Sequence, residues 1–379
     1  MSGLLVESQW KGIPRRVSTF ISFPEEIGDS QEPPPQPSTE GNLQIHKVIE
    51  CGKEMLSCQF NPSGVMLAVG LINGLIQVYS VSDGTCVHTL QDDQSVTAVT
   101  ALRFLPHRHM SQGDLLLASY AGGHVKFWHI PTQSCVRTLS EDRQTLTIAI
   151  NPSGSHFLTA GSSDDILVYD TESMTCVNIC QPSSSLSVMD GHRSRIFGLS
   201  FNPNSEEEFI SGGWDDTIQF WNIHQQHSLR KICGPHVCGD SLHIDPVTNQ
   251  ILIGSWRKAE NLQIWDYATG QKISTVPDDY RGPCRVYSCR WLGSDHMIAA
   301  GSDINMCRII DCNSFLTRGR LIDLPSGIYS MDVFSFSPTV SPLIAVTSGQ
   351  SIFLLRSTLR VNATSTDSFF SYSSEENPI

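Results

Sequence analysis

An apolar residue two positions before a proline recurs along most of this chain and divides it into units of similar length. The copies are Phe60-Asn-Pro62, Phe104-Leu-Pro106, Ile150-Asn-Pro152, Phe201-Asn-Pro203, Ile244-Asp-Pro246 and Phe336-Ser-Pro338, with Trp291-Leu-Gly293 in the sixth place. The steps between successive copies are 44, 46, 51, 43, 47 and 45 residues. A repeat of this period indicates an array of similar units rather than two unrelated domains.

Each unit contains short apolar runs separated by turns, a pattern typical of β-strands, and helical candidates are nearly absent. In the most complete unit, one run ends at Phe201, a second begins at Phe209, and a third extends from Thr217 to Asn222. About four antiparallel strands for every 40 to 45 residues, repeated seven times, favour an all-β fold. We predict a seven-bladed β-propeller of four-stranded antiparallel blades.

A count of strands predicts how the ring closes. The seventh unit ends near Leu355 without a clear fourth strand, while residues 43–49 read as a strand with no unit before them. Placing this N-terminal strand in the last blade would cover an open edge. We therefore expect a propeller at 42–357, a disordered Pro-rich arm at 1–41 and a disordered Ser-rich tail at 358–379.

These features resemble the WD-repeat β-propeller family over about residues 42–357. The resemblance rests on the period, the Phe-x-Pro turns and Trp265-Asp266, with Tyr169-Asp170 and Trp221-Asn222 as near variants. It implies a hydrogen-bonded structural tetrad in the fourth unit, formed by His192, Ser211, Asp215 and Trp221. A hydrolase built on the Ser-His-Asp set is disfavoured, because no nucleophile elbow such as Gly-x-Ser-x-Gly accompanies it.

The resemblance also implies an interaction platform whose partners bind at the mouth of the central channel. Positions in units four to six supply the candidate peptide-binding residues, which are Arg195, Phe197, Trp214, Asp240, Trp256, Arg285 and Tyr287. In family members that read arginine or methylated lysine, aromatic rings at similar positions sandwich the cation. The alternative is that these aromatic side chains pack against loops while the two arginines form surface ion pairs.

The leading hypothesis is a non-catalytic scaffold that binds protein or peptide partners as a subunit of a larger complex. A reader of arginine or methyl-lysine peptides is the first alternative, and a substrate receptor of a ubiquitin ligase is the second. The adaptor-binding variant of the repeat carries an arginine two residues after its Trp-Asp pair. Here Ala268 occupies that place after Trp265-Asp266, which lowers the ligase alternative.

Composition narrows these hypotheses further. The net charge of −13 disfavours direct nucleic-acid binding and is compatible with a basic peptide partner. No run of about 20 apolar residues predicts a membrane span. The twelve cysteines show no Cys-x-x-Cys pair, and we expect no metal, cofactor or disulfide framework. The expected location is cytoplasmic, with the nucleus as a second location.

The N-terminal arm carries one candidate modification site. Arg15-Arg-Val-Ser18 resembles the sequence preferred by basophilic kinases, in which two arginines pair with kinase carboxylates. Ser18 is therefore a candidate for phosphorylation.

Overall fold

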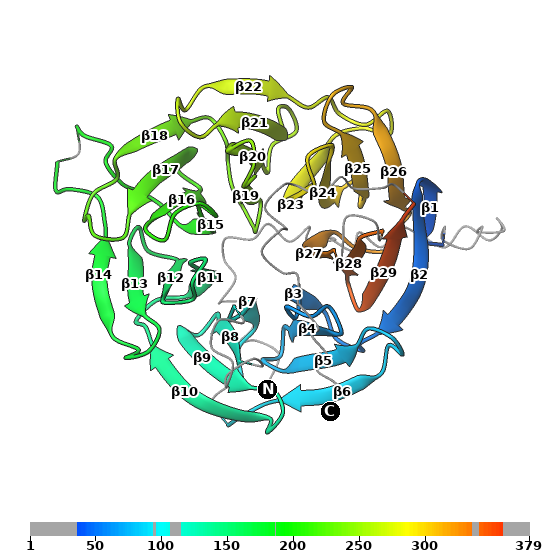
Figure 1. Ribbon diagram of the computed structural model, residues 1–379, viewed down its shortest axis with the longest axis horizontal. Coiled ribbons are helices and arrows are strands. Elements are labelled where there is room, and N and C mark those ends of the chain that lie inside the picture. Colours follow the sequence, from blue (N-terminus) through cyan, green and yellow to red (C-terminus); the bar gives the residue numbers. More distant parts are fainter. Residues whose placement is uncertain (1–35, 94–95, 107–114, 186, 336–340, 359–379) are drawn as a thin grey trace, which may run out of the picture. The chain divides into compact units, whose positions relative to one another are not determined.

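The computed structural model describes residues 36–93, 96–106, 115–185, 187–335 and 341–358. In these ranges every named element is a β-strand, and the strands form seven antiparallel sheets. The sheets are arranged as blades around a central channel (Figure 1). The predicted all-β, seven-bladed propeller is thereby confirmed. None of the described segments is a helix long and apolar enough to cross a membrane.

The blades run in chain order around the ring, each from an inner strand to an outer one. Blade one holds β3 (Met55–Phe60), β4 (Met66–Leu71), β5 (Ile76–Ser80) and β6 (Cys86–Leu90). Blade two holds β7 (Val99–Phe104), β8 (Leu115–Tyr120), β9 (His124–His129) and β10 (Ser134–Ser140). Blade three holds β11 (Thr145–Ile150), β12 (His156–Gly161), β13 (Ile166–Asp170) and β14 (Cys176–Cys180).

The second half of the ring follows the same plan. Blade four holds β15 (Ile196–Phe201), β16 (Glu208–Gly213), β17 (Thr217–Asn222) and β18 (Arg230–Cys233). Blade five holds β19 (Leu242–Ile244), β20 (Gln250–Gly254), β21 (Leu262–Asp266) and β22 (Lys272–Thr275). Blade six holds β23 (Cys284–Leu292), β24 (His296–Asp303), β25 (Cys307–Asp311), β26 (Thr317–Ile322) and β1 (Ser38–Gly41). Blade seven holds β27 (Ile328–Phe334), β28 (Leu343–Ser348), β29 (Ser351–Ser357) and β2 (Leu43–Glu50).

The apolar core lies between neighbouring blades. The second strand of a blade, such as β4, is buried along nearly its whole length, because other blades cover both of its faces. One cluster joins Phe60 and Tyr79 of blade one to Ala345 and Leu354 of blade seven. Stacking of blades is therefore what removes their apolar side chains from water.

The N-terminal strand closes the ring as expected. β2 pairs antiparallel with β29, from Leu43 opposite Ser357 to Glu50 opposite Ser351. It forms the outer strand of blade seven, which the C-terminal end of the propeller leaves incomplete (Figure 1). β2 and the C-terminal strand β29 thus belong to one blade.

The predicted boundary of the arm at residue 41 is too late, because β1 precedes β2. β1 pairs with β26 and adds a fifth strand to blade six. The Glu40 carboxylate holds it there, 2.9 Å from Nη2 of Arg281 and 3.3 Å from Nη1 of Arg320. Gly41 has φ 67°, and a Cβ at this position would lie 2.2 Å from the Arg318 carbonyl oxygen, so the crossing from blade six to blade seven requires glycine. The rest of the arm (1–35), the tail from 359 and Ser18 lie outside the described residues.

The seventh unit has a different register from the one that the proline pattern predicts. In the first six blades the apolar repeat residue pairs with the second strand as Phe60 pairs with Leu67. In blade seven the corresponding pair is Val333 with Ile344. Phe336 lies outside the described residues, beyond the end of β27. The match to Phe336-Ser-Pro338 was misleading because it lies three residues beyond Val333, the residue that holds the repeat position in blade seven.

Candidate functional site

Blade four brings the four predicted tetrad residues into one chain of hydrogen bonds. Nδ1 of His192 lies 2.9 Å from Oδ2 of Asp215, and because a carboxylate only accepts, Nδ1 carries the proton. Nε2 then accepts from the Ser211 hydroxyl at 2.7 Å, and the Trp221 indole donates to the same hydroxyl at 2.7 Å. His192 and Ser211 are fully buried, so no substrate reaches the serine oxygen. The network fixes the geometry between strands of the blade.

The environment of Asp215 predicts how pH acts on this network. Burial works to raise the pKa of Asp215, but the hydrogen bonds that it accepts from His192 and from the Arg193 backbone N–H outweigh it, and the pKa lies below its ordinary value. A lowered carboxyl pKa adds stability above the ordinary pKa of about 4, and this stability is lost as pH falls through the folded-state value. Asp215→Asn should lower the free energy of unfolding by about 2 kcal/mol at pH 7.

Urea unfolding of the two proteins at several pH values between 7 and 3 checks this expectation. The gap between wild type and Asp215→Asn should narrow as the pH falls below about 4. A gap that stays constant over this range would show that the ionised carboxylate is not what stabilises the blade.

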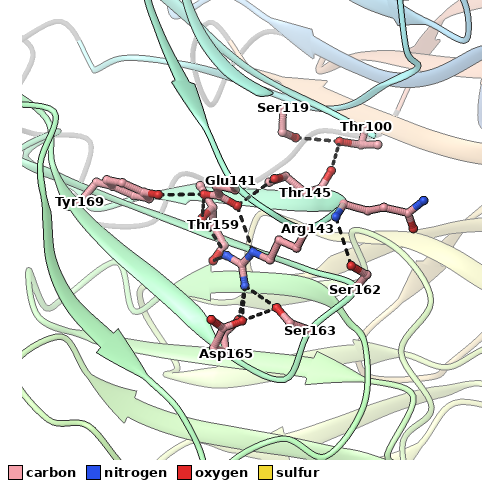
Figure 2. A network of polar contacts seen from close by, with 11 residues as sticks. Thr100, Ser119, Glu141, Arg143, Thr145, Thr159, Ser162, Ser163, Asp165 and Tyr169 are labelled. Atoms are coloured by element: carbon pink, nitrogen blue, oxygen red, sulfur yellow. Dashed lines mark hydrogen bonds and ion pairs between the residues drawn. The ribbon is translucent and has the colours of Figure 1, made fainter. Parts of the chain in front are cut away.

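Blade three contains a different network in the equivalent place, which the sequence analysis missed (Figure 2). Glu141 precedes β11 by the same number of residues as His192 precedes β15, so a carboxylate takes the place of the imidazole. It accepts from Tyr169 Oη at 3.0 Å and from Thr159 Oγ1 at 2.5 Å. Tyr169 and Thr159 hold the strand positions that Trp221 and Ser211 hold in blade four.

An arginine balances the buried charge of Glu141. Arg143 Nε lies 3.0 Å from Glu141 Oε2, and these side chains are only 8% and 2% exposed. Nη1 of Arg143 reaches Asp165 at 2.6 Å and Nη2 donates to the Thr159 carbonyl at 2.9 Å (Figure 2). Burial, followed by the charge of Glu141, raises the pKa of Tyr169. Two ion pairs that share Arg143, one with Glu141 and one with Asp165, thus take the place of the His-Asp pair of blade four.

The candidate peptide-binding residues form most of a continuous row of rings. Phe197 stacks on Trp214 with centroids 5.2 Å apart, and Trp214 stacks on His236 at 5.9 Å. His236 lies 6.4 Å from Trp256, whose indole donates to Tyr287 Oη at 2.7 Å. We call these residues, together with Tyr329, the aromatic row.

Tyr329 extends the aromatic row to blade seven. Its ring lies 5.1 Å from that of Tyr287, edge to face. Phe197, Tyr287 and Tyr329 each sit at a β-bulge near the start of an inner strand, where the pairing skips one residue. A bulge re-aims a side chain, and the same bulge in blades four, six and seven brings these rings to the same end of the channel. The row therefore crosses blades four to seven.

The arginines of the candidate set cover the two tryptophans. Cζ of Arg285 lies 4.1 Å from the centre of a Trp256 ring, and Cζ of Arg195 lies 5.6 Å from that of Trp214. Arg285 also pairs with Asp303 at 3.0 Å. Guanidinium groups of the chain itself thus lie over the faces of the Trp214 and Trp256 rings.

Asp240 does not join the aromatic row, contrary to its place in the predicted site. Its Oδ2 lies 2.9 Å from Nη2 of Arg103 in blade two and forms a second, short ion pair with Arg290 in blade six. Burial works to raise the pKa of Asp240, but the two arginines hold it well below its usual range. The charge of Asp240 is thus already used by two arginines.

The residues around Asp240 line a cavity of about 380 Å³ in the channel. One residue at the same register in each blade lines it: Gln59, Arg103, Ala149, Ser200, His243, Arg290 and Asp332. His243 accepts from the Trp291 backbone N–H at 2.8 Å, and burial lowers its pKa to about 3. Asp332 accepts from the Phe60 backbone N–H at 2.8 Å. These bonds tie neighbouring blades together, and no cluster of three or more metal-ligating residues occurs among the described residues.

His236 and Tyr329 are the row members that sequence reasoning missed. Tyr329 stands four positions before Val333, as Phe197 stands before Phe201, so counting from the correct residue of unit seven would have found it. His236 lies between β18 and β19, where no repeat position marks it.

Comparisons with known proteins agree with this architecture. The family model described as WD domain, G-beta repeat matches residues 183–222, which include β15, β16 and β17 of blade four. The model described as Anaphase-promoting complex subunit 4 WD40 domain matches residues 43–107. With the seven-bladed ring, these matches show that the chain is similar to WD-repeat β-propeller proteins.

Curated relatives share this chain's sequence only at low identity. Periodic tryptophan protein 2 of Arabidopsis thaliana is 26% identical over 281 residues, which are 68% of this chain and 29% of the relative. Protein FIZZY-RELATED 3 of the same plant is 24% identical over 64% of this chain and 48% of its own length. Ribosome biogenesis protein YTM1 of Phaeosphaeria nodorum is 25% identical over 34% of this chain and 27% of its own length. The chain thus spans less than half the length of these relatives.

Proposed function

We propose that this protein is a non-catalytic scaffold that docks protein partners on the aromatic row. The observation that supports this most directly is the continuity of the row across blades four to seven. Phe197 and Tyr287 are buried, while Trp214, His236 and Trp256 are partly exposed. Buried rings that support partly exposed ones make a rigid contact surface, and tryptophan and tyrosine are frequent anchors of protein interfaces.

Membership in a larger assembly is part of the proposal. A model named for a subunit of the anaphase-promoting complex matches part of this chain, and one relative is named as a ribosome biogenesis protein. Those names describe other proteins, and here they support a role as a subunit that holds partners. The assembly is proposed to be cytoplasmic or nuclear.

The two alternatives have less support. A reader of arginine or methyl-lysine needs open aromatic faces, yet Arg195 and Arg285 lie over those of Trp214 and Trp256. A receptor of a ubiquitin ligase would rest on the family resemblance alone, and Ala268 replaces the expected arginine. We therefore favour the general docking role.

A double substitution tests the docking site. Trp214→Ala with Trp256→Ala should reduce capture of the protein's stable partners in proximity labelling by about tenfold or more, because each removes an anchor from the interface. Trp265→Ala is the matched control, since this tryptophan is also half-buried but donates to Gln263 outside the row. Circular dichroism should confirm that both variants remain folded. If the double variant keeps all partners, the row is not the docking site.

A further inference from the structure

The arginines at the aromatic row present hydrogen-bond donors toward a partner. A guanidinium that stacks on an indole keeps its N–H groups in its own plane, free to point away from the ring. Arg285 is stacked in this manner on Trp256, and Arg195 lies near the Trp214 ring. The stacking limits the motion of a long side chain, so less entropy is lost when an oxyanion binds. The surface is therefore prepared for a hydrogen-bond acceptor.

The charges beside the row leave an excess of cations. His236 and Arg257 share a single carboxylate, that of Asp216, at 2.7 Å each. Arg285 has Asp303 as its partner, whereas Arg195 has no carboxylate partner within the described part of the chain. Three arginines thus face two carboxylates, although the whole chain has a net charge of −13.

The ion pairs already present are weak competitors for a partner. Asp303 is 42% exposed and Arg257 48% exposed, so water screens both of their pairs. A carboxylate or phosphate brought by a peptide and shielded by the aromatic row would lose less of its interaction to solvent. We therefore expect Arg285 to gain free energy when a partner's oxyanion takes the place of the Asp303 carboxylate in its ion pair.

We infer that the aromatic row binds an acidic segment of a protein partner, whose side-chain oxyanions pair with Arg195 and Arg285 while apolar groups contact the ring edges. This rests on the proposed docking function and names the chemical class of its partner. It also reverses the expectation of a basic peptide, which came from the net charge and from the aromatic positions at the channel mouth. The oxyanion is a glutamate or aspartate carboxylate or a phosphate on serine or threonine.

Peptide display against the full-length protein tests the inference directly, because the selection itself finds the preferred peptides. A random peptide library is selected on the protein, and the enriched sequences are read and resynthesised for fluorescence polarisation. The enriched peptides should carry acidic residues next to apolar ones. Their affinity should fall about tenfold for each of Arg195→Gln and Arg285→Gln. Arg318→Gln should leave it unchanged, because Arg318 pairs with Asp311 on the outer part of blade six.

Two further measurements complete the test. The affinity of the wild-type protein should fall as salt rises from 50 to about 500 mM, which needs no variant and so does not depend on folding. Peptides with phosphoserine in place of glutamate should bind at least as tightly, which would identify phosphate as the preferred source of the oxyanion; weaker binding would identify carboxylate.

The outcomes separate this inference from the docking function itself. Enrichment of basic or uncharged peptides whose binding needs Trp214 and Trp256 would overturn the acidic specificity and leave the docking site in place. Binding that survives both the arginine and the tryptophan substitutions would overturn both proposals. Failure to enrich any peptide, or tighter binding of a nucleic acid than of the acidic peptides, would also overturn the inference.

Discussion

A chain that begins at residue 52, and so lacks β1 and β2, should fail to form a cooperatively folded propeller. β2 supplies the whole outer edge of blade seven and buries Leu43 and Ile49. Loss of these two side chains alone costs about 3–6 kcal/mol, and β29 loses its pairing partner as well. Because domains are stable by only about 5–15 kcal/mol, this loss is comparable with the whole free energy of unfolding.

Thermal unfolding followed by circular dichroism, together with size-exclusion chromatography, measures the result. A chain that begins at residue 36 is the matched control and should unfold like the full-length protein, since it keeps both strands. A synthetic peptide of residues 36–50 should restore folding of the short chain by filling the open edge. If the short chain melts at the wild-type temperature without the peptide, β2 does not close the ring in solution.

Substitution of Glu141 by leucine should cost about 3 kcal/mol of unfolding free energy. The change leaves the buried Arg143 with only the partly exposed Asp165 as a counter-ion, and it removes the acceptor of Tyr169 and Thr159. Breaking a buried ion pair on one side typically costs about 3–5 kcal/mol. We expect the lower end of this range of free energies, because Asp165 remains as a counter-ion for Arg143.

Urea unfolding of a double-mutant cycle tests this account. The double variant Glu141→Leu with Arg143→Leu should lose less than the sum of the single variants, because it leaves no uncompensated charge from the pair. Arg318→Leu breaks a pair in which the arginine is 41% exposed and should cost less than about 1 kcal/mol. A loss in Glu141→Leu no larger than in this control would show that the network of blade three is not what stabilises the blade.

The aromatic row shows how far a repeat pattern can locate a candidate site. Counting from the repeat residues found Phe197 and Tyr287 because blades four and six place a bulge at the same distance along their inner strands. The same count placed Asp240 with them, yet this carboxylate pairs with Arg103, which lies 137 residues earlier in the chain. Repeat position predicts where the backbone lies. It does not predict which side chain from another blade reaches it.

The network of blade three illustrates a second limit. The family pattern identifies a tetrad by histidine, serine, aspartate and tryptophan, and it therefore found only the copy in blade four. In blade three a carboxylate and a phenol occupy the histidine and tryptophan places, with Arg143 added to balance the charge. A different set of side chains forms a hydrogen-bonded network at the same strand positions. Only the distances between their atoms show that these side chains bond to one another.

The number of blades, the order of their strands and the closure of the ring by residues 43–49 could all be predicted from the sequence. These follow from the spacing of apolar runs and turns, which is a local property of the chain. The tertiary structure alone decided that β1 crosses to blade six, that Val333 rather than Phe336 ends the seventh inner strand, and that Arg195 and Arg285 cover the tryptophans. Each of these depends on contacts between segments far apart in the chain, which no local pattern specifies.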